Sequence, residues 1–377
     1  MTHPSNLAET ATDTLSRPAT VADLDALVEI EQHAFIHDRF SRRNLRYLLL
    51  RAHAATWVLV DETDRPFAYV MVLFHAGTSL ARLYSYAVLP ARRGEGYGHQ
   101  LLNLAEQVAR AQDCVEMRLE VHEANAASLA LVRRHGYRQF EVRPGYYEDS
   151  GTALRFEKRL IAAPEGVTIA VPYYRQTLDF TCGPAALMMA MHALRPDMQL
   201  TRTLELRLWR EATSIFMTAG HGGCDPYGLA LAALRRGFRV SVYASEPGRM
   251  FTGTVRDTEK KVVMELVQED FLAQLRDAGA HLLDAPLTPD ALPALLARGA
   301  LPVVLISSYR IYHERSPHWV VVTGVDERLI HVHDPYVDET YQRSATDSVN
   351  LPIRKDDFVR MARYGRSAQR GFVLLEH

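Results

Sequence analysis

The feature that most constrains the fold is an interruption in the middle of the chain, where one pattern of secondary structure stops and another begins. The stretch "IAAPEGVTIA" contains a proline and a glycine that break helical and strand periodicity. At about 150 residues per domain, a chain of 377 residues is long enough for two domains. The sequence therefore predicts a flexible tail at residues 1–16, one domain at 17–160, a linker at 161–169 and a second domain at 170–377.

The first predicted domain alternates helical and strand patterns. "ATVADLDALVEIEQHAF" has apolar residues at helical spacing, and "ATWVLVDETDRPFAYVMVLFHAG" has two β-rich runs around a polar turn, as expected of a hairpin. There follow a strand ending at Pro90, a helix at residues 98–113, a strand at 115–125 and a short helix stopped by Gly136. Further strands complete what we predict to be an α/β unit.

The second predicted domain places helices before strands. Helical patterns occupy residues around 184–194 and 226–236, and the later runs "LPVVLISS", "HWVVVTGVD", "RLIHVHDP" and "RGFVLLEH" are β-rich. Helices followed by a run of strands are typical of an α+β domain with an antiparallel sheet.

Composition narrows the classes of function. A net charge of −2 argues against a general nucleic-acid or membrane-surface binder. The three cysteines, Cys114, Cys182 and Cys224, are irregularly spaced and do not indicate a disulfide framework. No apolar run approaches the roughly 18 residues that span a membrane, and the polar N-terminus lacks a signal-peptide pattern. We therefore expect a cytoplasmic protein that binds neither nucleic acid nor membrane.

A glycine-rich loop, "RRGEGYG", follows an apolar strand of the first domain and opens an apolar helix. Alternate glycines leave backbone N–H groups uncrowded, so that they can converge on an anion such as a pyrophosphate at the helix N-terminus. Taken alone, the loop fits a tight turn equally well. The spacing is not G-x-G-x-x-G with an acidic residue about 20 positions later, which disfavours a dinucleotide-binding fold.

Residues 17–160 resemble the GNAT N-acetyltransferases, whose pattern (R/Q)-x-x-G-x-(G/A) occurs in this loop. The stretch "LEVHEANAASLALVRRHGYRQFEVRPGYY" is similar to the RimI-type protein N-terminal acetyltransferases. The resemblance implies a mixed, mostly antiparallel sheet with helices on both faces, acetyl-CoA as cofactor and an amine as acceptor. The coenzyme site that it implies comprises Val88, Arg93, Gly94, Gly96, Tyr97, Gly98 and Asn125.

Acetyl transfer to an amine needs a base for the ammonium and an acid for the departing thiolate. By the same resemblance, Glu120 matches the general base of the family. The family's acid is a tyrosine twelve positions later, where this chain has Val132. Tyr137, Tyr146 or Tyr147 could replace it, or could instead serve only as packing residues. Two other interpretations are open: the coenzyme thiolate leaves without help from an acid, or the domain binds its ligand without efficient acetyl transfer.

Cys182 is the candidate nucleophile of the second domain. Gly183, Pro184 and a run of apolar helix formers follow it, so a helix is expected to begin near the cysteine. The positive end of a helix dipole favours a thiolate at that position. A buried cysteine that only packs against its neighbours is the competing interpretation.

Possible partners for this thiol lie about 150 residues later. His318 begins one predicted strand and Asp334 follows the next, so a tight turn between the strands would bring the two side chains together. The imidazole can hold the thiolate and protonate a leaving group, while the carboxylate fixes the ring. Gln176 and the Cys182 backbone N–H can stabilise a developing oxyanion.

This order resembles the papain-like cysteine peptidases of the bacteriocin-processing, double-glycine-leader type. Their pattern is a glutamine, five residues, then Asp-Cys-Gly or a variant, and later His-(F/W/Y)-V-V followed by Asp-Pro; here it reads as Gln176, "TCGPA", "HWVVV" and "HDP". The resemblance covers about 170–377 and implies a papain-like α+β fold with Cys182, His318 and Asp334 as catalytic residues and Gln176 in the oxyanion hole. Those peptidases are usually attached to membrane exporters, whereas this chain has no spanning segment, which puts a leader-export role in doubt.

A metal site is the alternative use of the histidines and cysteines in this half of the chain. "HGGC", with His221 and Cys224, has ligand-like spacing, and "HVH" places His331 and His333 on one strand face. A glycine-rich turn before a helix explains the first pattern more simply, and we expect no metal.

The sequence thus predicts a bifunctional protein in which an acetyl-CoA-dependent N-acetyltransferase acting on a peptide or protein amine is fused to a thiol peptidase or amide hydrolase. One alternative is that the first domain is an acetyl-CoA sensor that regulates the second. Another is that the second domain is a vestigial peptide-binding module. The acceptor amine, the scissile bond, the choice between hydrolysis and acyl transfer, and the oligomeric state stay open.

Overall fold

The computed structural model describes residues 15–161, 166–213, 222–314, 316–338 and 345–377, which form two compact units. The first unit runs to residue 161 and the second follows it, except that residues 76–79 group with the second. Within the described ranges, no helix combines the length and the apolar character needed to cross a membrane.

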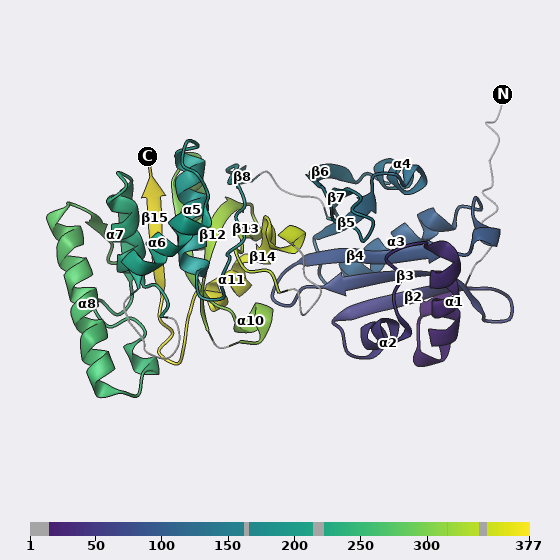
Figure 1. The fold of residues 1–377 in the computed structure, drawn as a ribbon, viewed down its shortest axis with the longest axis horizontal. Helices are drawn as coiled ribbons and strands as arrows, with labels where there is room; N and C mark the ends of the chain where they lie inside the picture. The colour runs from purple at the N-terminus through teal and green to yellow at the C-terminus, as the bar shows by residue number, and fades with distance from the viewer. Residues whose placement is uncertain (1–14, 162–165, 214–221, 315, 339–344) are drawn as a thin grey trace, which may run out of the picture. The chain divides into compact units, whose positions relative to one another are not determined.

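The first unit is built on a seven-stranded sheet with the order β1-β2-β3-β4-β5-β7-β6 (Figure 1). Neighbouring strands are antiparallel except for β4 and β5, which are parallel and are connected through a helix. The strands are β1 Ser16–Pro18, β2 Ala54–Val60, β3 Pro66–Phe74, β4 Leu80–Val88, β5 Glu116–His122, β6 Arg138–Arg143 and β7 Ala153–Arg159.

Four helices bury the apolar side chains of both faces of this sheet: α1 Leu24–Ala34, α2 Arg42–Leu50, α3 Tyr97–Ala111 and α4 Ala126–Arg134. The alternation of side chains along a strand sends odd and even residues to opposite faces. On β3, Val70 and Val72 pack with α3 and α4, whereas Tyr69 and Met71 pack with α1 and α2. The expected mixed sheet with helices on both faces is therefore confirmed.

The parallel pair β4 and β5 separates along its length. Their pairing covers only Leu80–Arg82 against Glu116–Arg118, although both strands continue beyond it. The backbones of the later residues are not paired with each other, and Glu120 and Val88 lie on these separated parts. Where the two strands separate, side chains can occupy the space between them. A continuous ladder of backbone hydrogen bonds would leave no such space.

The second unit has an eight-stranded sheet with the order β10-β9-β15-β11-β12-β13-β14, and β8 pairs with the end of β12. The last strand of the chain, yellow in Figure 1, lies inside the sheet between β9 and β11. Only β9 and β10 are parallel among these pairs. The strands are β8 Val167–Thr168, β9 Arg239–Ala244, β10 His281–Leu282, β11 Leu301–Ser307, β12 Pro317–Val325, β13 Leu329–His333, β14 Leu351–Arg354 and β15 Gly371–Glu376.

The central helix of this unit is α5, which packs against β11, β12 and β15 and against two further helices. Its residues from Cys182 to Met191 are all buried, which explains a sequence that is apolar on every side. The helices are α5 Cys182–Leu194, α6 Arg202–Ala212, α7 Pro226–Leu234, α8 Thr258–Asp277, α9 Leu292–Ala297, α10 Tyr309–Tyr312 and α11 Lys355–Met361. The antiparallel α+β arrangement predicted for this half is confirmed.

Residues 161–169 differ in part from the predicted linker. Val167 and Thr168 form β8 and pair with Val325 and Gly324 of β12. A side chain at Gly324 would meet the Thr168 side chain at 2.8 Å, so this close approach requires a glycine. So short a strand, close to a proline and a glycine, shows no recognisable alternation of polar and apolar residues in the sequence.

Candidate active sites

Helix α5 begins at Cys182, as expected, and Pro184 lies in its first turn. The cysteine is 9% exposed, so its sulfur is largely shielded from water at the positive end of the helix. Ten buried residues at the start of this helix fix its position against the sheet. The location thus suits an activated thiol, provided that a base is in reach.

The group in reach of this sulfur is His318. The second residue of β12, it forms a side-chain hydrogen bond with Cys182. The ring Nε2 lies 2.7 Å from Oδ1 of Asp334, which leaves Nδ1 as the nitrogen for the thiol. Asp334 follows β13 directly, and the antiparallel pairing of β12 with β13 brings it beside the start of β12. The structure therefore places Cys182, His318 and Asp334 in one chain of contacts.

The charges around His318 set its protonation. Burial of the ring lowers the pKa of His318, but the charge and hydrogen bond of Asp334, together with the hydrogen bond and charge of Cys182, outweigh this effect and raise the pKa to about 10. At neutral pH the imidazole is therefore protonated, and it lies beside the Cys182 sulfur.

Asp334 is held by groups that the sequence analysis did not identify. Its carboxylate is fully buried and accepts hydrogen bonds from the Tyr312 hydroxyl at 2.7 Å and from the Tyr336 backbone N–H at 2.9 Å. The Tyr312 ring also meets the His318 ring edge-on, with 5.8 Å between centroids. No motif marks Tyr312, because its contact with Asp334 joins two segments that are 22 residues apart in the sequence.

Gln176, the expected oxyanion donor, lies next to the carboxylate segment. Its backbone N–H donates to the Pro335 carbonyl at 2.9 Å, and its side chain is 7% exposed. The side-chain Nε2 donates to the Leu178 carbonyl at 2.7 Å, while Oε1 is buried and has no hydrogen-bond partner among the described residues. A primary amide carries two N–H groups, so one donor of Gln176 is left for another acceptor.

The alternative metal ligands have other partners. His333 uses both ring nitrogens, one with the Val171 carbonyl at 2.7 Å and one with the Asn350 N–H at 2.9 Å. The Cys224 side chain forms a hydrogen bond with Thr213. His221 lies outside the described residues, and across the described ranges no three His, Cys, Asp or Glu side chains are grouped to hold a metal ion.

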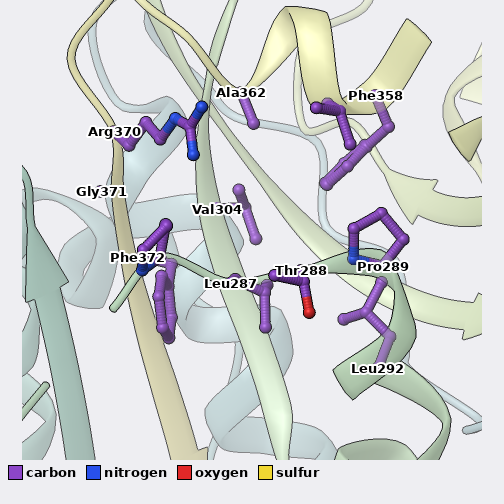
Figure 2. A pocket seen from close by; sticks show the side chains of 12 residues that line it. Leu287, Thr288, Pro289, Leu292, Val304, Phe358, Ala362, Arg370, Gly371 and Phe372 are labelled. Carbon is purple, nitrogen blue, oxygen red and sulfur yellow. The ribbon is translucent and has the colours of Figure 1, made fainter. Parts of the chain in front are cut away.

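A cavity of about 30 Å³ in the second unit is lined mostly by apolar residues, from β11, β15, α11 and the region around α9. Figure 2 shows Leu292, Val304, Phe358 and Phe372 around it. Neither Cys182 nor His318 lines it, so it is separate from the Cys182 site.

In the first unit, the glycine-rich loop leads into the N-terminus of α3. Gly94 and Gly96 have φ angles of +86° and +87°, which favour glycine, and a side chain at either would meet no atom within 4 Å. Within the described residues, the backbone N–H groups of Gly94, Gly96 and Gly98 donate to no protein acceptor. Backbone donors without a protein acceptor at a helix N-terminus suit the pyrophosphate of a coenzyme.

The other expected coenzyme residues shape this loop. The Arg93 guanidinium donates to the Val88 carbonyl at 3.2 Å and so ties the loop to the end of β4. The Tyr97 ring is buried against Phe67, with 4.8 Å between centroids. Asn125 caps α4 by accepting from the Ser128 N–H at 3.1 Å.

Glu120, the expected general base, lies between two arginines. Arg82 Nε is 3.0 Å from its Oε2, and Arg155 Nε is 3.9 Å from its Oε1. All three side chains are at most 7% exposed. Arg82 also donates to the Tyr146 hydroxyl at 2.8 Å. The sequence analysis did not identify either arginine. An arginine inside an apolar strand such as "LARLY" nevertheless indicates a buried acidic partner.

The candidate acids occupy different environments. Val132 is fully buried in the core with α3 and α4, and the Tyr137 hydroxyl donates to the Met117 sulfur at 3.1 Å, as expected of a packing residue. Tyr146 and Tyr147 are half-buried, and burial followed by the charge of Glu120 raises the pKa of Tyr147. A raised pKa keeps a phenol protonated, which an acid requires.

Two family models match different parts of the chain. A family described as Peptidase_C39 like matches residues 171–376, just over half of the 377 residues, and the Acetyltransferase (GNAT) family matches residues 24–137. The [ribosomal protein bS18]-alanine N-acetyltransferase of Salmonella typhimurium is 31% identical over 149 residues, which are 38% of this chain and 92% of the relative. A putative enzyme of the same description from Bacillus subtilis is 23% identical over 135 residues, 36% of this chain and 87% of the relative.

Among solved structures, the ribosomal-protein-S18-alanine N-acetyltransferase from Escherichia coli is 22% identical, with a TM-score of 0.37, and covers 40% of this chain and 97% of that one. Arabidopsis thaliana NAA60 in complex with acetyl-CoA is 15% identical, with a TM-score of 0.36, and covers 38% of this chain and 97% of that one. The GNAT family match assigns acetyl-CoA as the cofactor of the first unit. The chain belongs to the Peptidase_C39 like family, and its peptidase-like domain is preceded by an acetyltransferase domain of the GNAT family.

Proposed function

We propose that the C-terminal domain hydrolyses a peptide or amide bond with Cys182 as nucleophile. The observation that carries the proposal is the chain of hydrogen bonds from Cys182 through His318 to Asp334. A vestigial peptide-binding module would have no use for a thiol, an imidazole and a carboxylate in this order.

In the proposed reaction the Cys182 thiolate attacks the substrate carbonyl carbon and forms a C–S bond. The negative charge that develops on the carbonyl oxygen is stabilised by the Cys182 backbone N–H and by the second N–H of Gln176. His318 then gives its proton to the amine nitrogen as the C–N bond breaks. The neutral imidazole next takes a proton from water, whose oxygen replaces the sulfur and releases the acid.

The test of this proposal is labelling of the thiol in the full-length chain. Iodoacetamide at neutral pH should alkylate Cys182 rapidly, while Cys114, which is buried and whose pKa burial raises to about 12, serves as the internal control. In His318→Ala the rate at Cys182 should fall to that of an ordinary thiol. Equal rates at Cys182 in the wild type and in His318→Ala would rule the proposal out.

We propose further that the N-terminal domain acetylates the amine of a peptide or protein. Two relatives are described as alanine N-acetyltransferases of a ribosomal protein, which supports an N-terminal amine as the acceptor. Acetyl-CoA supplies an activated thioester when bound. The N–H groups of Gly94, Gly96 and Gly98 would hold its pyrophosphate, and Glu120 would accept the proton of the ammonium while Arg82 and Arg155 balance its charge.

Acetylation of peptide libraries by the full-length chain tests this second activity. Calorimetry with acetyl-CoA measures binding separately, which distinguishes an enzyme from a sensor. Tight binding without turnover on any peptide would favour the sensor, which the buried Val132 in place of the family's acid motivates.

A third proposal connects the two domains: cleavage at Cys182 exposes an amine that the first domain then acetylates. Its only support is that both domains occur on one chain. The test is a mixture of Cys182→Ala with a variant deficient in acetylation. This mixture contains both activities, but on separate chains. If this mixture makes the final product as fast as the wild type, the two sites gain nothing from fusion.

A further inference from the structure

Glu205 on α6 is a fully buried carboxylate that has four hydrogen-bond donors around it. Its Oε1 accepts from the Thr177 backbone N–H at 2.8 Å and from the Thr181 hydroxyl. Its Oε2 accepts from the Thr177 hydroxyl at 2.7 Å and from the Tyr174 hydroxyl at 2.9 Å. One side chain thus binds three residues of the segment 174–181.

The four donors are what make this buried charge tolerable. No lysine or arginine in the described part of the chain forms an ion pair with Glu205. Burial of an uncompensated carboxylate is costly, so Glu205 depends on these donors. The segment 174–181 therefore has little freedom to move relative to α6.

This segment carries the groups assigned to the oxyanion. Gln176 lies within it, and Thr181 is the residue before Cys182, so the Thr181–Cys182 peptide bond bears the Cys182 N–H. The Thr181 hydroxyl and the Gln176 Nε2 also meet at the Leu178 carbonyl, at 2.9 and 2.7 Å. The orientation of both oxyanion donors thus depends on how this short segment is held.

We propose that Glu205 is a positioning residue of the C-terminal site, which fixes the oxyanion donors through Thr177 and Thr181. This inference rests on the proposed thiol chemistry of Cys182. Glu205 does not touch the thiol or His318; its effect is on the geometry of the Gln176 and Cys182 N–H groups.

Two reagents separate the oxyanion from the thiol without knowledge of the natural substrate. p-Nitrophenyl acetate acylates a thiolate through a tetrahedral oxyanion and releases p-nitrophenolate. Iodoacetamide alkylates the same sulfur by displacement of iodide, and no oxyanion forms. The ratio of the two rates at Cys182 in the full-length chain therefore reports the oxyanion donors, with Cys182→Ala as the blank for both.

Thr181→Val removes one contact to Glu205 at nearly constant volume, and Glu205→Ala removes all four. We expect the ratio of acylation to alkylation to fall about ten-fold in Thr181→Val and about 100-fold in Glu205→Ala. Glu205→Gln should recover most of the loss, because its carbonyl can serve Thr177 and Thr181 while the two remaining hydroxyls turn to accept from its amide. Phe180 packs on Trp209 of α6, with 4.9 Å between ring centroids. This second contact between the segment 174–181 and α6 does not involve Glu205, and it favours folding of the variants.

Glu211→Gln is the matched control, because Glu211 lies on the same helix but pairs with Arg236 and does not contact the segment. Its ratio should equal that of the wild type. An unchanged ratio in Thr181→Val and in Glu205→Ala overturns the positioning role even if their melting temperatures fall. If Cys182 of the wild type reacts with neither reagent, the nucleophile assignment fails, and this inference fails with it.

Discussion

The Nε2 atom of His318 lies 2.7 Å from Oδ1 of Asp334, and the same imidazole is hydrogen-bonded to Cys182. The carboxylate is fully buried and fixed by Tyr312 through its second oxygen. A ring held by such a carboxylate cannot turn away from the thiol without loss of a charge-assisted hydrogen bond. The geometry therefore favours one orientation of His318, with Nδ1 toward Cys182.

Asp334→Asn is expected to reduce amide hydrolysis by roughly 100-fold, because an amide keeps the shape of the carboxylate but removes the charge that stabilises imidazolium. Turnover per titrated Cys182 is the measurement. Tyr312→Phe removes one hydrogen bond but keeps the charge, so its loss should be much smaller. A larger loss in Tyr312→Phe than in Asp334→Asn would mean that the position of the carboxylate, rather than its charge, controls the site.

The pH dependence of hydrolysis should have an alkaline limb near pH 10. His318 must carry a proton to give to the leaving amine, and its pKa is raised to about 10. Hydrolysis should therefore fall as the pH rises through this value, whereas alkylation of the thiolate should not. In Asp334→Asn the limb should move to lower pH, and a limb that stays in place would contradict the role of the Asp334 charge.

The same proton affects stability. The pKa of His318 rises from 6.5 to about 10 on folding, so the folded chain binds the proton more tightly than the unfolded chain. This contribution to the free energy of unfolding is present in full below pH 6.5 and is lost as the pH rises toward 10. Denaturant unfolding of the C-terminal domain at a series of pH values should show this decline, and His318→Gln should flatten it.

Much of the fold could be predicted from the sequence because its signals are local. The α5 helix begins at Cys182 as predicted, since an apolar run after a proline has few other solutions. The long helix α8 escaped prediction: Val262, Val263 and Leu266 are exposed on it, which blurs the division into an apolar and a polar face. Strand β9, which lies between two helices in sequence, was also not anticipated.

The supporting residues of both sites could not be predicted for a different reason. Glu205, Tyr312 and Arg155 act through contacts with residues far away in the sequence, and no spacing rule records such contacts. A nucleophile and its histidine belong to a motif, whereas the groups that hold them depend on how helices and strands pack.

Glu120→Gln is expected to lower the free energy of unfolding of the N-terminal domain by about 3 kcal/mol, because the buried Arg82 would lose its ion pair with Glu120, whereas Arg155 keeps its ion pair with Glu141. Loss of acetylation in this variant alone therefore does not identify a base. The double variant Arg82→Gln with Glu120→Gln also removes the arginine charge that Glu120 balances, and it should regain part of the stability in denaturant unfolding. If the double variant regains stability but not acetylation, Glu120 has a chemical role; if acetylation returns as well, its role is structural.

Gly96→Ala should weaken binding of acetyl-CoA by more than it weakens the fold. Gly96 precedes α3 with a φ of +87°, where an alanine costs about 1–2 kcal/mol in backbone strain. A shift of the loop to relieve that strain would turn its N–H groups away from the pyrophosphate. Gly136→Ala is the matched control, since Gly136 has a φ of +88° and only an ordinary contact at 3.8 Å, and it lies after α4 outside the loop. Calorimetry with acetyl-CoA should show weaker binding for Gly96→Ala alone, while both variants lose similar stability. Equal affinity in the two variants would mean that the loop is a tight turn and that the coenzyme is held elsewhere.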